Sequence, residues 1–132
     1  MEVLKIIIEK SSDYYDAYAE NCEGVYGAGS TAEEAKTDVL KAIELYKETQ
    51  KQEDLPDILK GEYQIVYRFD VQSMLNYYNK IFTKVALENI TGLNQKQLHH
   101  YASGLKKPRE NTRKKIENAL HKLGNELITV EL

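Results

Sequence analysis

Residues 83–103 read TKVALENITGLNQKQLHHYAS, and this stretch decides how the C-terminal half of the chain folds. Glycine takes the left-handed backbone conformation easily, so we expect a helix over residues 83–91 to end in a sharp turn at Gly92. Asn94 is a favoured N-cap residue for a second helix over residues 95–103. The stretch therefore predicts two short helices joined by a tight turn.

The second predicted helix has an apolar face and a polar face. Leu98, Tyr101 and Ala102 have the spacing of inward-facing residues. An α-helix fits the major groove of duplex DNA, where amide, hydroxyl and basic side chains hydrogen-bond the base edges. We therefore expect this helix to read DNA bases with Gln95, Lys96, His99, His100 and Ser103.

Basic residues follow this helix and continue into the next, which apolar periodicity predicts over residues 110–123 with an end at Gly124. Positive side chains beside a reading helix bind phosphates and so position the protein on the duplex. The expected phosphate contacts come from Asn94, Gln97, Lys106, Lys107, Arg109 and Arg113.

The two halves of the chain carry opposite charge. Residues 1–79 contain 8 Lys and Arg against 16 Asp and Glu, a net charge of −8, whereas residues 80–132 contain 10 against 5, a net charge of +5. A basic DNA-binding module joined to an acidic domain of another function would have this pattern, although surface charge also varies without a functional reason.

The composition is that of a folded protein, with 42% hydrophobic and 30% charged residues among 132, enough for two small domains. The apolar run Ile6–Ile8 is too short for a signal peptide or for the ~20 residues of a membrane span, so we expect the protein to stay in the cytoplasm. A single cysteine, Cys22, offers no metal-ligand spacing, and His99 and His100 point ~100° apart on a helix. We expect no metal site, no catalytic residue and no cofactor.

The N-terminal half predicts a small sheet and one helix. The strands are expected over residues 2–9, 14–20 and 24–29. Glycine in the third strand indicates a bend or the close approach of another backbone. A helix then begins at Thr31, which forms a capping box with Glu34.

Two more strands are expected over residues 62–69 and 127–132, and their pairing is left open. Asp70 is a suitable cap for a helix that starts at Val71. The predicted organisation is a first domain over residues 1–60, a connecting strand over 61–70 and a DNA-binding domain with a terminal strand over 71–132.

The C-terminal half resembles the Cro/CI-type helix-turn-helix family. One position departs from the family pattern, because Glu88 stands in the first helix where a small residue is usual. The resemblance rests on Leu87, Gly92, Leu93, Leu98, Tyr101, Gly104, Pro108, Ile116, Ala119 and Leu120.

The N-terminal half resembles the HicB antitoxin domain. The matching motifs are GAGSTAEEA at residues 27–35, with its Thr-x-Glu-Glu-Ala helix start, and AIELY at residues 42–46. The resemblance implies a partial ribonuclease H-like β-β-β-α domain, and many family members carry a C-terminal DNA-binding module. The expected fold class is therefore α+β, with that domain followed by an all-helical helix-turn-helix domain.

This resemblance implies a type II antitoxin. Its N-terminal domain would bind and block a HicA-like toxin, an mRNA-cleaving protein, and its C-terminal domain would bind operator DNA and repress the shared operon. Acidic side chains at Asp16, Glu20 and Glu23 would suit a positively charged toxin surface, or they are only solvated. Half-site reading generally requires two-fold pairing, so we expect a homodimer or a higher even oligomer.

Two other functions compete with this prediction. A ribonuclease H-like nuclease would hold two metals ~4 Å apart with several carboxylates, but the middle of the first strand reads Lys5-Ile6-Ile7-Ile8. We therefore expect a binding protein and not an enzyme. A stand-alone transcription regulator without a toxin partner is the other alternative, which the sequence does not separate from an antitoxin.

Overall fold

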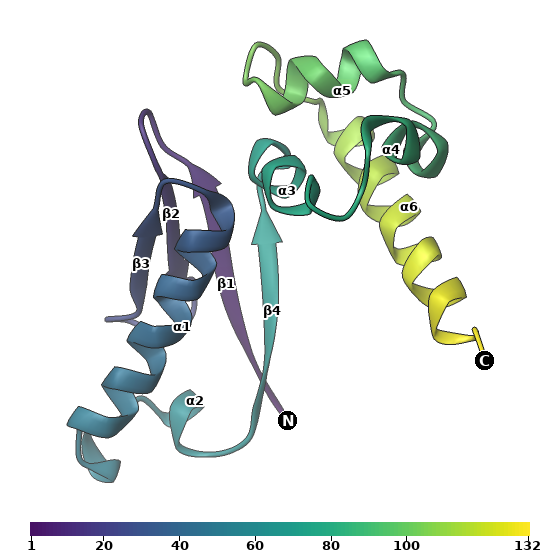
Figure 1. Ribbon diagram of the computed structural model, residues 1–132. Helices are drawn as coiled ribbons and strands as arrows, with labels where there is room; N and C mark the ends of the chain where they lie inside the picture. The colour runs from purple at the N-terminus through teal and green to yellow at the C-terminus, as the bar shows by residue number, and fades with distance from the viewer. The chain divides into compact units, whose positions relative to one another are not determined.

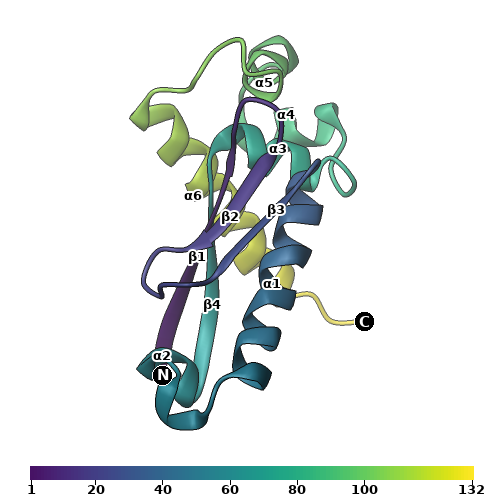
Figure 2. The ribbon, with the colours of Figure 1, turned by 90° about the vertical axis from the view of Figure 1, so that its left-hand side faces the viewer.

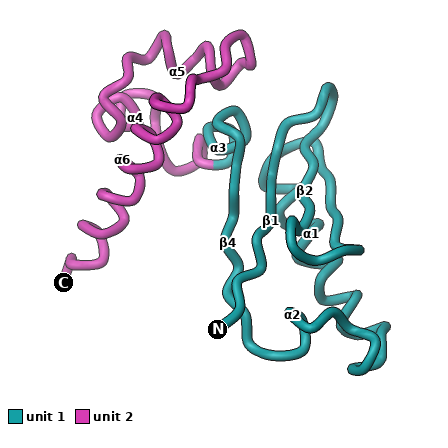
Figure 3. Tube along the Cα trace, turned by 180° about the vertical axis from the view of Figure 1, so that it is seen from behind, with its two compact units in different colours: residues 1–77 teal, residues 78–132 magenta.

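The computed structural model describes residues 1–132 and has an α+β fold. It contains a four-stranded mixed sheet, six α-helices and a short 3-10 helix, η1. The chain divides into two compact units, Met1–Tyr77 and Tyr78–Leu132, which we name unit 1 and unit 2 (Figure 3).

Unit 1 is built around one sheet with the strand order β3-β2-β1-β4 (Figures 1 and 2). Strand β1 is antiparallel to β2 and parallel to β4, and β2 is antiparallel to β3. The strands span Glu2–Lys10 (β1), Tyr15–Ala19 (β2), Tyr26–Gly29 (β3) and Tyr63–Phe69 (β4).

The core of unit 1 lies between this sheet and helix α1, Ala32–Thr49, which runs across one face (Figure 2). Alternate residues of β1 are fully buried on that face: Leu4, Ile6 and Ile8. They belong to one cluster with the α1 stripe Ala32, Ala35, Val39 and Ile43. Burying each large aliphatic side chain contributes roughly 1.5–3 kcal/mol, so this layer is the main source of the unit's stability.

Two glycines of β3 allow α1 to lie directly on that strand. A Cβ atom at Gly27 would stand 2.4 Å from the backbone nitrogen of Val39. One at Gly29 would stand 2.4 Å from the Cβ of Glu34. The predicted close approach of another backbone to this strand is confirmed.

The start of α1 follows the predicted capping box only in part. The Thr31 hydroxyl accepts a hydrogen bond from the Glu34 N–H at 3.1 Å, as expected. The Glu34 carboxylate, however, accepts from the backbone N–H of Ser30 at 2.8 Å and from its hydroxyl. These bonds, the hydroxyl bond first, lower the pKa of Glu34.

Unit 1 extends further along the chain than the predicted first domain, which ended at residue 60. After η1 (Gln52–Asp54) and α2 (Asp57–Lys60), β4 pairs with β1, so it is a strand of the sheet and not a separate connector. The sequence places helix α3, Val71–Tyr78, in the DNA-binding domain, but nearly all of it lies in unit 1.

Two side chains attach α3 to unit 1. Asp70 caps α3 at the Ser73 N–H (2.7 Å), as predicted, and its other oxygen accepts from the Lys10 N–H (2.9 Å). Asn76 accepts from the Ala32 N–H at 2.9 Å, at the start of α1. The unit boundary at residues 77/78 therefore lies beyond the predicted one.

Unit 2 contains helices α4 (Lys84–Thr91), α5 (Gln95–Ala102) and α6 (Glu110–Ile128). The predicted strand over 127–132 is wrong, and so is the predicted helix end at Gly124. Helix α6 continues through Gly124, which has no positive φ, because glycine inside a helix costs only about 1 kcal/mol relative to alanine. The buried residues of unit 2 are Leu87, Thr91, Leu93, Leu98, Tyr101 and Ile116.

None of the helices combines the length and the apolar character needed to span a membrane.

Candidate nucleic-acid interface

A tight turn joins α4 to α5. Thr83 caps α4 by accepting from the Ala86 N–H at 3.0 Å. Gly92 ends the helix with φ at 76°, and its N–H donates to the Glu88 carbonyl at 2.8 Å. The left-handed turn predicted at Gly92 is confirmed, so the direction of α5 is set by a residue type that takes this φ without strain.

Thr91 holds the inside of this turn, a role that the sequence did not reveal. Its side chain is buried, and its hydroxyl donates to the Leu87 carbonyl at 2.7 Å and accepts from the Leu93 N–H at 3.2 Å. The sequence feature that could have indicated this role is a polar residue four places after Leu87, at an inward-facing position of the helix. A threonine hydroxyl there can bridge the last turn of α4 to the loop.

Two predicted phosphate-binding residues are already engaged within unit 2. Asn94 caps α5, since its side-chain oxygen accepts from the Gln97 N–H at 2.8 Å. The half-buried Gln97 amide donates to the Tyr101 hydroxyl at 3.0 Å. These bonds stabilise α5 itself, so the basic residues are the stronger candidates for phosphate contacts.

The predicted reading residues lie mainly on the exposed face of α5. Gln95, Lys96, His99 and Ser103 are exposed, whereas His100 is half-buried. The Gln95 amide donates to the Glu88 carboxylate at 3.1 Å. This contact explains how Glu88 is accommodated in α4: the residue is half-buried and its charged end meets the start of α5.

Ala102 has the spacing of an inward-facing residue and is exposed instead. It is the last residue of α5, and the chain turns away from the core at Ser103 and Gly104, where φ is 80°. The helix therefore ends before Ala102 can meet a packing partner.

Positive charge gathers around His100 from two segments of the chain. Its pKa is lowered by partial burial first, and then by the charges of Lys106 and Lys96, with a contribution from His99. The loop after α5 brings Lys106 back, because the Lys106 N–H donates to the His100 carbonyl at 3.2 Å. The fold thus combines Lys96 of α5 with Lys106 of the loop in one basic surface.

We predict that His100 titrates below its ordinary pKa of 6.5. The folded chain holds this proton less tightly than the unfolded chain, so the linked stability is present above pH 6.5 and is lost as the pH falls below it. Proton NMR titration of the imidazole measures the midpoint. Lys106→Ala should raise it towards 6.5, and a midpoint that does not move would remove Lys106 from the surroundings of His100.

The remaining predicted phosphate contacts, Lys107, Arg109 and Arg113, are all exposed. Lys115 is a further candidate phosphate contact, which is not among those predicted from the sequence. Its ammonium group lies 3.7 Å from the position that a Cβ atom would take at Gly92, close to the C-terminal end of α4. A cation is favoured at a helix C-terminus, and this one also borders the turn into α5.

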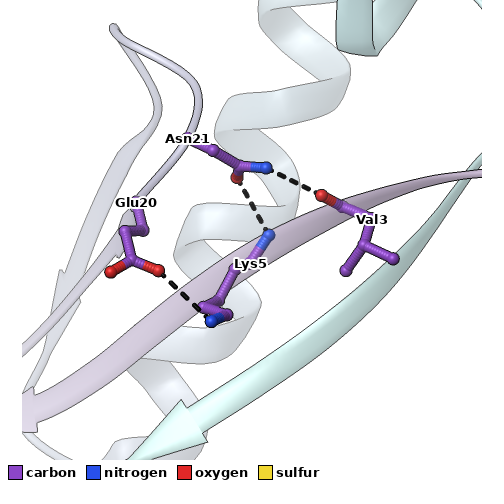
Figure 4. A network of polar contacts seen from close by, with 4 residues as sticks. All are labelled: Val3, Lys5, Glu20 and Asn21. Atoms are coloured by element: carbon purple, nitrogen blue, oxygen red, sulfur yellow. Dashed lines mark hydrogen bonds and ion pairs between the residues drawn. The ribbon is translucent and has the colours of Figure 1, made fainter.

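The predicted toxin-facing acids lie in unit 1. Asp16 lies within β2, and Glu20 directly follows the strand. Glu23 is exposed in the connection to β3. Asp16 accepts a hydrogen bond from the Ser11 hydroxyl. Glu20 forms an ion pair with Lys5 at 3.5 Å (Figure 4). Of the three, Glu23 is the acid with neither of these contacts.

Asn21 holds the end of β2 against β1. Its side-chain amide donates to the Val3 carbonyl at 2.7 Å and accepts from the Lys5 N–H at 3.0 Å (Figure 4). The carboxamide thereby replaces a backbone peptide group of a longer strand. This bond pair fixes the position of Glu20, the neighbouring residue.

No three His, Cys, Asp or Glu side chains lie together in a way that could hold a metal ion. The chain matches no protein-family model, no curated protein and no solved structure.

Proposed function

We propose that unit 2 is a helix-turn-helix module that binds duplex DNA. The observation that carries the proposal is the left-handed turn at Gly92, which sets α5 directly after α4 with Gln95, Lys96 and His99 exposed. A second helix placed in this way can enter the major groove and reach base edges with its first turns.

The electrostatics of unit 2 support the same role. Unit 2 contains residues 80–132, whose net charge is +5. The cations of Lys96 and Lys106 are close enough to lower the pKa of His100. Binding phosphates with such cations releases counterions from the DNA, which favours association and makes it salt-dependent. Base reading would then come from α5 and positioning from the basic loop after it.

We propose that unit 1 is a HicB-like antitoxin domain of a partial ribonuclease H-like type, and that the chain represses its own operon. The order of three strands followed by a helix supports this, as does the packing of the glycine-containing β3 against α1. The net charge of −8 in residues 1–79 is complementary to a toxin that grips RNA with basic residues.

The carboxylates of unit 1 support a binding role and not a nuclease role. Both oxygens of Asp70 accept hydrogen bonds from backbone N–H groups, those of Ser73 and Lys10. The middle of β1 presents buried Leu4 and Ile6 to the core and Lys5 to the other face. Metal-dependent phosphodiester cleavage needs several converging carboxylates, which these residues do not provide.

The antitoxin function is tested by co-expressing the chain with the product of the adjacent toxin-like reading frame. We expect restored growth and a complex that co-purifies. We further expect Glu23→Lys to slow association with the toxin several-fold at low salt, because an exposed acid that steers encounter becomes a repelling cation. Surface plasmon resonance at several salt concentrations measures the rate.

Glu53→Lys is the matched control for this variant. Glu53 is also exposed and lies in η1, so the two substitutions change the net charge equally and differ only in position. Equal slowing by both variants would place Glu23 outside the toxin surface. Growth that is not rescued, with no complex formed, would leave a stand-alone DNA-binding regulator as the function.

A further inference from the structure

The two edges of the sheet differ in how they are protected. At one edge, β3 has four residues, and the Ala28 N–H donates to the Asp38 carboxylate of α1 at 2.9 Å. At the other edge, β4 has seven residues, YQIVYRF, with no proline, glycine, lysine or acid. Proteins usually protect long edge strands with such residues, because an unpaired edge can pair with another strand. Strand β4 has one charged residue, Arg68, and no other residue of this protecting kind.

The backbone groups that β4 presents at this edge follow from its pairing with β1. The Asp70 N–H, directly after β4, donates to the Ile8 carbonyl of β1 at 3.2 Å. Successive residues of a strand direct their N–H and C=O groups to opposite sides, so even-numbered residues face β1. Tyr63, Ile65, Tyr67 and Phe69 therefore direct their backbone groups to the free edge.

We propose that β4 pairs antiparallel with β4 of a second copy of this chain, about a two-fold axis at Val66. In this register Ile65 bonds Tyr67 of the second copy, and Tyr63 bonds Phe69 of the second copy. All four residues have backbone groups directed to the edge, so each pair exchanges both hydrogen bonds. The register uses the full length of the strand and joins the two sheets into one.

The side chains of β4 are complementary to themselves in this register. On the face towards α1, Tyr63 meets Phe69 and Ile65 meets Tyr67, pairs of the aromatic and β-branched kind that stabilise sheets. These four residues are only half-buried within one chain, so the pairing would complete their burial. A two-fold axis perpendicular to the sheet keeps the α1 faces of the two copies on the same side.

The opposite face of β4 is also compatible with a second copy. Val66, 40% exposed, meets Val66, and Gln64 meets Arg68. Arg68 is the single charged residue of the strand, so no like charges oppose each other. This seam carries no acid, in contrast to the net charge of −8 in residues 1–79, which would repel a second copy at most other surfaces.

The pairing does not depend on the proposed DNA or toxin binding. It supplies a closed, isologous contact, in which the same patch serves both copies. A dimer of this kind would carry two copies of α5 and could engage two half-sites.

Light scattering and sedimentation of the full chain over a range of concentrations test the proposal. We expect the unmodified chain to form a dimer and Val66→Lys to raise its dissociation constant at least about tenfold, because two ammonium groups then face each other at the axis. Val3→Lys is the matched control: Val3 is 42% exposed on the same face but lies on β1, one strand away from the edge. It should remain a dimer.

Disulfide trapping checks the register independently. Val66 would form a non-hydrogen-bonded pair with its counterpart, with Cα atoms about 4.5 Å apart. That separation allows a disulfide, so Val66→Cys should cross-link on oxidation and Val3→Cys should not. The native Cys22 is buried and its burial raises the thiol pKa, so it contributes little background.

Four results would overturn the proposal. The first is a monomer at all concentrations, and the second is a dimer that survives Val66→Lys. The third is a dimer that dissociates in the Ile128→Lys variant but not in the Val66→Lys variant, which would place the contact at the exposed end of α6. The fourth is a Val66→Lys variant that loses only a complex with the toxin, because β4 would then pair with a foreign strand.

Discussion

Replacing Gly27 with alanine should destabilise unit 1 by about 3 kcal/mol, the upper end of what overpacking costs. The added Cβ would stand 2.4 Å from the Val39 nitrogen and 2.8 Å from its Cα, so α1 must move away from β3. Backbone atoms cannot rotate aside as a flexible side chain could. For a unit of this size each kcal/mol corresponds to roughly 4–8 °C in Tm.

Urea unfolding followed by circular dichroism measures this effect, with Gly61→Ala as the matched control. At Gly61 an added Cβ would meet no atom within 4 Å, and the φ of −118° is one that any residue adopts. Its replacement should be neutral or stabilise by up to about 1 kcal/mol. Hydrogen exchange should localise the loss in Gly27→Ala to residues 1–77. Equal stability of the two variants would contradict the tight packing of α1 on β3.

Replacing Lys96 with alanine should weaken binding to a preferred operator by about 1–3 kcal/mol and weaken binding to random DNA less. Lys96 is exposed on α5, and its charge acts on His100 from the same surface as Lys106. A residue that reads a base contributes mainly on the correct sequence. Fluorescence anisotropy with both DNAs measures the difference.

The double variant Lys106→Ala with Lys107→Ala should behave differently from Lys96→Ala. It should weaken binding to all sequences and reduce the salt dependence by about one unit for each lost phosphate contact. Lys122 is an exposed residue of α6, so Lys122→Ala is the control for the loss of one positive charge in Lys96→Ala. Equal weakening on both DNAs by Lys96→Ala would make Lys96 a phosphate contact, and an unchanged salt slope would remove Lys106 and Lys107 from the interface.

The predictions that the structure confirms are local ones. The caps at Thr31, Asp70 and Asn94 and the turn at Gly92 each depend on a residue's own conformational preference and on neighbours within four positions. The buried positions of Leu98 and Tyr101 on α5 follow from a helical period. The candidate site could be anticipated to the same extent, because its exposed residues lie on one short helix.

The incorrect predictions lie where a local preference is weak. Glycine at position 124 predicts a helix end, but glycine is tolerated inside helices and α6 continues to Ile128. Ala102 faces solvent because its helix ends there. The Glu34 carboxylate accepts its hydrogen bonds from the N–H and hydroxyl of Ser30, one residue before the predicted partner, while the Thr31 backbone makes a smaller contribution to its lowered pKa.

Most of the helices and strands, the residues at which they begin, and the polar face of α5 could be predicted from local sequence alone. Those properties arise from short-range hydrogen bonds and from the periods of strand and helix. The pairing of β4 with β1, the place of α3 in unit 1 and the return of Lys106 to His100 became visible only in the folded chain. Each of these contacts joins residues of different elements, so it depends on how surfaces fit and on which backbone groups remain unpaired.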